Sequence, residues 1–159
     1  MKQLNIFLIF ILAMSFGCDD NTIDNSISVD EQLAIDITIL DNWFADTTIT
    51  DVIEHTSDIR YTVNKAGNGT TSPGLSDVVE VTYEGRFLDT GEVFDSNFGF
   101  PFILSQTIWG WQIMLQEMKE GDEFTIYLPS KYSYGPRGNG GIPPNAILVF
   151  DITLISINN

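Results

Sequence analysis

The residues whose types could support chemistry are concentrated in one stretch, 132–151, near the end of the chain. Its first half is rich in glycine and proline, which favour turns and remove backbone donors, so we expect a surface loop there. Its second half runs into 146–157, whose β-branched and aromatic residues predict a well-covered strand. The sequence therefore predicts a loop tipped with Tyr134 and Ile142 that is joined directly to a core strand carrying Phe150.

No residue pattern in the chain favours metal-dependent or nucleophilic catalysis. The chain has one cysteine, Cys18, and one histidine, His55, which are too few for a cysteine-based zinc site or an internal disulfide. There is no Ser-His-Asp order and no phosphate-binding loop. The formal charge of −15 disfavours nucleic acid as a partner. We therefore expect neither a metal nor a cofactor, and chemistry that relies on aromatic surface.

Four groups of residues resemble, in the expected order, the FK506-binding-protein family of peptidyl-prolyl isomerases. The last group is the stretch 132–151, which reads Tyr-x-Tyr-Gly, a glycine-rich loop, and Ile-Pro-Pro-x-Ala-x-Leu-Val-Phe-Asp. The earlier groups are Val-Thr-Tyr-Glu-Gly at 81–85, Gly-Glu-Val-Phe-Asp-Ser at 91–96 and Ile-Trp-Gly-Trp at 108–111. The resemblance covers residues 57 to 157, the size of one domain.

The resemblance implies an α+β domain in which an antiparallel β-sheet wraps around one short α-helix. It also implies an enzyme that needs no cofactor, because prolyl isomerisation breaks no covalent bond. The barrier of about 18–20 kcal/mol comes from amide resonance, and it falls as the C–N bond twists. Since the twisted amide is less polar than the planar one, a dry aromatic pocket would favour the transition state over the ground state.

Carried over position by position, the resemblance implies two sets of site residues. Tyr134 would donate its hydroxyl to a substrate carbonyl, and Asp95 would accept from Tyr83 or polarise the amide region. Trp111 would form the floor under the proline, and the backbone of Ile108 would bond the peptide. The catalytic set is Tyr83, Phe94, Asp95 and Tyr134, and the substrate-binding set is Phe100, Phe102, Ile108, Trp111, Ile142 and Phe150. An aromatic residue in a small domain can also be plain core, but Trp111 and Tyr134 within ordered motifs favour a pocket.

The chain departs from the family pattern beside this pocket. The segment between Asp95 and Phe100 is several residues shorter than in typical members, and the basic residue that often neutralises the buried aspartate is missing. We therefore expect Asp95 to be more solvated, or its pKa to be raised. Thr107 replaces a usual aliphatic residue, and Trp109 stands where Arg or Pro is common. These changes leave a second interpretation open: a proline-peptide binding or chaperone module with little or no turnover.

The N-terminus predicts export and a lipid anchor. Residues 1–17 carry Lys2 and the apolar run 6–14, which is typical of a signal peptide and too short to span a bilayer comfortably. Ser-Phe-Gly followed by Cys18 resembles a bacterial lipoprotein cleavage box, so we expect Cys18 to be lipidated. The protein would then belong to the bacterial cell envelope, and we favour the outer membrane without choosing a face. An ordinary signal followed by a free cysteine is the alternative.

Between the anchor and the domain we expect a polar tether over 18–29 and a helix with its connector over 30–51, followed by the isomerase domain over 52–159. Asp30 is the expected N-cap of the helix. Leu33, Ile37, Leu40 and Phe44 recur at helical spacing, with Glu31, Asp36 and Asp41 on the opposite side. We expect this helix to pack on its own domain. The second apolar strip, Ile35, Ile39 and Trp43, leaves a dimer through 30–45 or client holding as the alternative.

Within the domain, the alternation of apolar and polar residues predicts several strands and one short helix. The helix is expected over 108–118, interrupted early by Gly110. The strands are expected over 53–64, 78–88, 92–96, 123–128 and 146–157, with a further short strand carrying Phe100 and Phe102.

Overall fold

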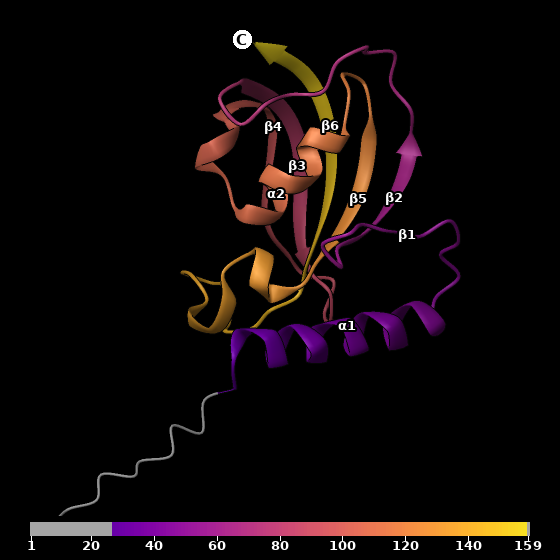
Figure 1. Cartoon of the computed structure of the whole chain (residues 1–159), viewed down its shortest axis with the longest axis vertical. Helices are drawn as coiled ribbons and strands as arrows, with labels where there is room; N and C mark the ends of the chain where they lie inside the picture. Colours follow the sequence, from indigo (N-terminus) through magenta and orange to yellow (C-terminus); the bar gives the residue numbers. More distant parts are fainter. Residues whose placement is uncertain (1–26, 159) are drawn as a thin grey trace, which may run out of the picture.

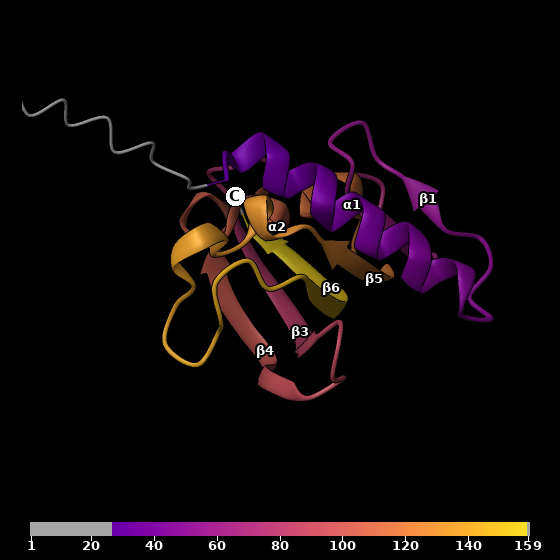
Figure 2. The same ribbon diagram turned by 90° about the horizontal axis from the view of Figure 1, so that it is seen from below.

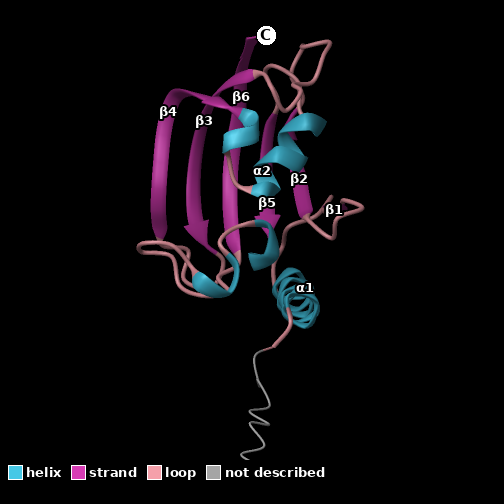
Figure 3. Cartoon of the chain, turned by 60° about the vertical axis from the view of Figure 1, so that its left-hand side comes forward, coloured by secondary structure: helices cyan, strands magenta, loops and turns pink. Residues whose placement is uncertain are grey.

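The computed structural model describes residues 27–158. They form one six-stranded antiparallel sheet, in the order β1-β2-β5-β6-β3-β4, with the short helix α2 against one face (Figures 1 and 3). The long helix α1 crosses below one end of the sheet (Figures 1 and 2). The expected α+β architecture is confirmed. The predicted signal peptide, Cys18 and most of the tether lie outside the described residues.

The chain runs through these elements in a simple order. The strands are β1 Ile53–Glu54, β2 Arg60–Lys65, β3 Val78–Phe87, β4 Val93–Ile103, β5 Glu123–Leu128 and β6 Leu148–Asn158. The helices are α1 Val29–Ala45 and α2 Trp109–Met114, and four single 3₁₀ turns follow β4, α2 and β5: Leu104–Gln106, Leu115–Glu117, Ser130–Tyr132 and Gly135–Arg137.

β3 and β6 are neighbouring inner strands of the sheet and lie side by side along ten residue positions. In β3, Val79, Val81, Tyr83 and Gly85 are buried on one face, as the alternation predicted. Their side chains meet those of β6 and α2 in a single hydrophobic core. This face carries the site, because the rings that project from it stay between the sheet and α2.

The edge strand β4 differs from its prediction. Residues 92–96 and the strand with Phe100 were expected as separate pieces, whereas Val93–Ile103 is one strand. It stays paired with β3 throughout, with register shifts between Val81 and Tyr83 and again before Arg86. The reason is the short connection after Asp95, which has too few residues to leave the sheet and return.

Two further local predictions were wrong. The strand expected over 53–64 is split, because residues 55–58 form a turn in which the Asp58 amide donates to the His55 carbonyl at 2.9 Å and Asp58 adopts a positive φ of 63°. Gly110 does not interrupt its helix. A Cβ there would lie 2.6 Å from Leu128, so glycine is what allows α2 to approach β5 closely.

Helix α1 packs on its own domain, as expected, but its details differ. Ser28, not Asp30, is the N-cap, and it forms a capping box with Glu31. Leu40 is fully buried in a small second core with Leu88, Tyr127, Ile147 and Val149. Asp36, predicted on the outer side, is also fully buried.

The Asp36 carboxylate is buried because the first turn after β5 points donors at it. It accepts from the Ser130 amide at 2.7 Å and from the Ser130 hydroxyl at 2.6 Å. Gln32 donates to its other oxygen at 2.8 Å. A second anchor is the ion pair of Asp41 with the buried Arg60 at 3.2 Å. These contacts hold α1 in a fixed place beside the loop that leads to Tyr134.

Candidate active site

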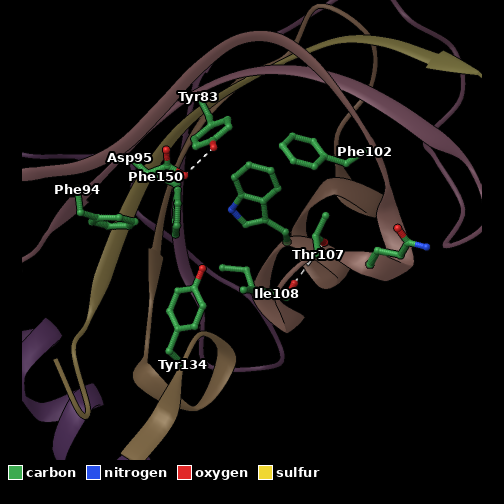
Figure 4. A pocket seen from close by; sticks show the side chains of 10 residues that line it. Tyr83, Phe94, Asp95, Phe102, Thr107, Ile108, Tyr134 and Phe150 are labelled. Carbon is green, nitrogen blue, oxygen red and sulfur yellow. Dashed lines mark hydrogen bonds between the residues drawn. The ribbon is translucent and has the colours of Figure 1, made fainter. Parts of the chain in front are cut away.

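A cavity of about 210 Å³ opens between the concave face of the sheet, α2 and the loop after β5. Strands β3, β4 and β6 supply one wall, and α2 with the turn before it supplies the other (Figure 4). Its lining residues are Tyr83, Phe94, Asp95, Phe102, Gln106, Thr107, Ile108, Trp111, Tyr134 and Phe150. Six of the ten are aromatic, so a bound group would meet mainly ring faces and edges.

Trp111 is the centre of the aromatic packing. The rings of Tyr83, Phe102 and Phe150 meet its indole nearly edge-on, with centroid distances of 4.9, 5.7 and 5.4 Å. Such edge contacts stabilise aromatic pairs beyond the area that they bury. The side chain is 4% exposed, and its Nε1–H has no acceptor among residues 27–158. Its neighbours therefore hold the indole in one orientation at the base of the cavity.

Gly85 sets the spacing of two other rings. A Cβ at this position of β3 would lie 2.7 Å from both Phe150 and Phe94. Those rings meet edge to face across the space, with centroids 5.7 Å apart. The missing side chain of Gly85 thus makes room for two walls of the cavity. The sequence motif contains this glycine, but only the packing reveals what it does.

Asp95 brings the only charge into the cavity lining. The Tyr83 hydroxyl donates to Asp95 Oδ2 at 2.7 Å (Figure 4). Burial, and after it the hydrogen bond and charge of Asp95, raises the pKa of Tyr83 well above its ordinary value. Asp95 is exposed, and within residues 27–158 it forms no ion pair. The Asp95 carboxylate therefore accepts a hydrogen bond from Tyr83 and is otherwise open to water, with no basic residue beside it in the described part of the chain. This agrees with the expectation that Asp95 is more solvated.

Tyr134 enters from the glycine-rich loop. Its hydroxyl points into the cavity, on the side facing Ile108 (Figure 4). Burial, and secondarily the charge of Asp95, raises the pKa of Tyr134. Both cavity tyrosines therefore keep their protons at neutral pH and remain able to donate a hydrogen bond.

The structure brings eight of the ten predicted site residues into the lining: Tyr83, Phe94, Asp95, Phe102, Ile108, Trp111, Tyr134 and Phe150. Phe100 lies outside it and packs against Phe102 with the two rings tilted, their centroids 5.0 Å apart. Ile142 is also outside the lining; it packs half-buried against the main core from the loop. For both residues, contact with a bound peptide stays a prediction.

Two lining residues were not among the predicted site residues. Gln106 and Thr107 form the turn between β4 and α2, and Thr107 donates its hydroxyl to the Leu104 carbonyl at 2.8 Å. Gln106 is exposed and Thr107 is half-buried, and together they give the cavity a polar edge. The sequence signal was weak, because Thr107 attracted attention only as a departure from the family pattern and Gln106 not at all.

A sequence model described as "FKBP-type peptidyl-prolyl cis-trans isomerase" matches residues 69–155, more than half of the chain. The chain belongs to this family. The match includes β3, β4, β5 and most of β6, and with them every residue that lines the cavity. In this FKBP-type chain the aromatic cavity therefore lies wholly within the family's own domain, while α1 is outside it.

Individual relatives agree with the family. The chain is 45% identical over 105 residues to the FKBP-type peptidyl-prolyl cis-trans isomerase FkpA of Aeromonas hydrophila, covering 64% of this chain and 38% of FkpA. It is 44% identical over 106 residues to the outer membrane protein MIP of Legionella longbeachae, covering 64% of this chain and 45% of that protein. The chain thus spans less than half the length of these relatives. A crystal structure of a peptidyl-prolyl cis-trans isomerase from Pseudomonas syringae superposes with a TM-score of 0.70 at 31% identity, covering 84% of this chain and 98% of that one.

Proposed function

We propose that the chain catalyses cis-trans isomerisation of Xaa-Pro bonds and assists the folding of exported proteins. The observation that carries this proposal is the aromatic cavity with Trp111 at its base and the Tyr83–Asp95 hydrogen bond at its side. Uncatalysed prolyl isomerisation takes tens to hundreds of seconds and can limit folding. A small domain that lowers this barrier would act on many unfolded chains.

In the proposed mechanism, the substrate proline ring lies on the indole of Trp111, between Phe102 and Phe150. The apolar walls exclude water from the amide, which favours the less polar twisted form. Tyr134 donates its hydroxyl to a carbonyl of the peptide and fixes the part of the chain that does not rotate. Asp95, held by Tyr83, lies beside the rotating amide. No bond is formed or broken, and no proton changes place.

The first test is isomerisation of short Xaa-Pro peptides by the chain from Asp19 onward, followed by exchange NMR. We expect clear acceleration by the wild type and a loss of kcat/KM of about tenfold or more in Trp111→Ala, because the floor of the cavity disappears. Tyr83→Phe, which removes only the hydroxyl that Asp95 accepts from, should lose less. Trp109→Ala is the matched control, since Trp109 is 60% exposed and outside the lining. Equal losses in Trp109→Ala and Trp111→Ala would contradict this site.

The second candidate function is a proline-peptide binding module with little or no turnover. The observation that favours it is β4, which continues without a loop past the cavity and leaves Asp95 exposed. Its signature would be a wild type that binds proline peptides but does not accelerate isomerisation, with binding lost in Trp111→Ala.

We also propose that Cys18 carries a lipid that attaches the protein to the bacterial cell envelope, with the outer membrane as the favoured location. Support comes from the sequence before Cys18 and from the similarity to the outer membrane protein MIP of Legionella longbeachae. No helix within residues 27–158 is long and apolar enough to cross a bilayer. Intact-mass analysis of the membrane fraction should find acyl chains on the wild type and none on Cys18→Ser. A wild-type protein without acyl chains would contradict this proposal.

A further inference from the structure

A second hollow, larger than the aromatic cavity, lies at the α1 end of the sheet. It measures about 800 Å³ and is enclosed by α1, the β3–β4 turn and the segment 141–147. These three segments lie at the same, lower end of the domain in Figure 1. The Leu88 amide donates to the Ile147 carbonyl at 3.1 Å and joins two of them directly. We call this hollow the flanking groove.

The floor of the flanking groove is apolar and partly open. Ile39 and Trp43 of α1 line it from one side, and Phe87 and Pro143 line it from the others. Ile39 is 45% exposed, so a large part of its apolar side chain is open to solvent in the groove. Two of the three residues in the second apolar strip of α1, Ile39 and Trp43, therefore form one wall of a concave surface.

The rim of the flanking groove carries negative charge only. Asp46, Asp89 and Glu92 line it, and no lysine or arginine does. Within residues 27–158, none of these three carboxylates forms an ion pair. An apolar floor with an unneutralised acidic rim complements a segment that carries both apolar and basic side chains.

The flanking groove adjoins the aromatic cavity. Phe87 lines the groove, Phe94 lines the cavity, and their ring centroids are 5.1 Å apart. One extended polypeptide could therefore occupy both spaces by passing this pair of rings. The groove also exists before any ligand arrives, because Asp36 and Leu40 fix α1 against the domain. A preformed surface binds without the cost of ordering it.

We propose that the flanking groove binds apolar and basic residues that flank the proline of the same client polypeptide. This inference rests on the proposed isomerase function and specifies its substrate class: extended, cationic, partly apolar segments of unfolded chains. A short Xaa-Pro peptide is held by the cavity alone. The groove therefore affects only substrates that are long enough to reach it.

The test compares three peptides with the full chain. One is a short Xaa-Pro tetrapeptide, and the other two extend it on both sides with either leucine and lysine or serine and glutamate. We expect the leucine-lysine peptide to have a kcat/KM about tenfold above that of the tetrapeptide, the factor expected from burying one leucine-sized side chain. Ile39→Glu and Glu92→Lys should each remove most of this advantage and leave the tetrapeptide rate unchanged.

Ile35→Glu is the matched control. Ile35 lies one turn before Ile39 on the same helix, is 42% exposed and does not line the groove. It should retain the full advantage of the long peptide. Equal rates on all three peptides in the wild type, or equal losses in Ile35→Glu and Ile39→Glu, would overturn the groove proposal while leaving the isomerase proposal intact.

A direct binding measurement tests the groove proposal even if the isomerase proposal fails. If the wild type isomerises nothing, the proposed function fails, and a leucine-lysine peptide without proline still tests the groove by titration calorimetry. Binding that is lost in Ile39→Glu and kept in Ile35→Glu would support the groove. Sedimentation provides the last check: a wild-type dimer that Ile39→Glu dissociates would assign the groove to a second copy of the chain and overturn the client proposal.

Discussion

At the residue scale, the cavity depends both on the side chains that line it and on Gly85, which makes room for two of them. Tyr83, Asp95, Trp111 and Tyr134 stand in recognisable motifs, and the structure gathers them around one cavity. Gly85 shows the limit of a motif. What fixes its identity is a contact with two rings from other strands, and that contact depends on tertiary packing.

Gly85→Ala should therefore damage the site through its walls. The added methyl would lie 2.7 Å from Phe94 and Phe150, and their rings must shift. We expect a loss of stability of about 1–3 kcal/mol from overpacking, with a lower kcat/KM for the Xaa-Pro tetrapeptide. Thermal unfolding and exchange NMR measure the two effects. Gly141→Ala is the control, because nothing lies within 4 Å of a Cβ there; a wild-type-like Gly85→Ala would refute the role of this glycine.

At the element scale, α1 shows what periodicity can and cannot predict. Leu33, Ile37, Leu40 and Phe44 correctly indicated a helix that packs on the domain. The same pattern placed Asp36 outside, because a carboxylate in an amphipathic helix is normally solvated. Its buried position depends on the donors of Ser130, which lie 94 residues away and leave no trace in a local pattern.

Asp36→Ala should detach α1 from the loop that follows β5. It leaves the buried Ser130 amide and hydroxyl without their acceptor, so we expect a loss of about 3 kcal/mol in the free energy of unfolding. Urea unfolding checks the value. Thr38→Ala, an exposed change on the same helix, should stay within about 0.5 kcal/mol of the wild type. If the two variants were equally stable, the buried carboxylate would have no role in holding α1.

At the scale of the whole molecule, the resemblance implied an antiparallel sheet around a short helix, but the strand order comes from the structure alone. Alternation located most strands, but nothing in their sequences places β6 between β3 and β5. One global property emerges only from the folded chain. All five tyrosines, Tyr61, Tyr83, Tyr127, Tyr132 and Tyr134, have a raised pKa, and burial is the largest cause in each.

This shared shift predicts alkaline unfolding. In the unfolded chain the tyrosines ionise near their ordinary pKa of 10.0, whereas the folded chain keeps their protons to higher pH. Above the ordinary tyrosine pKa, the folded state holds more protons than the unfolded state. The contribution of these tyrosines to the free energy of unfolding is therefore fully present below that pKa and is lost as the pH rises. Urea midpoints should drop between about pH 9 and pH 11. Tyr132→Phe should make this decline shallower, and a midpoint independent of pH would contradict the prediction.

The position of β6 also constrains the order of events during synthesis. A polypeptide that emerges N-terminus first presents β3 and β5 long before the strand that must lie between them. Until Leu148–Asn158 is available, the rings around Trp111 have no Phe150 to pack against, and core side chains of β3 and β5 stay uncovered. A chain that we propose to act on unfolded polypeptides thus passes through a stage in which it resembles its own proposed clients.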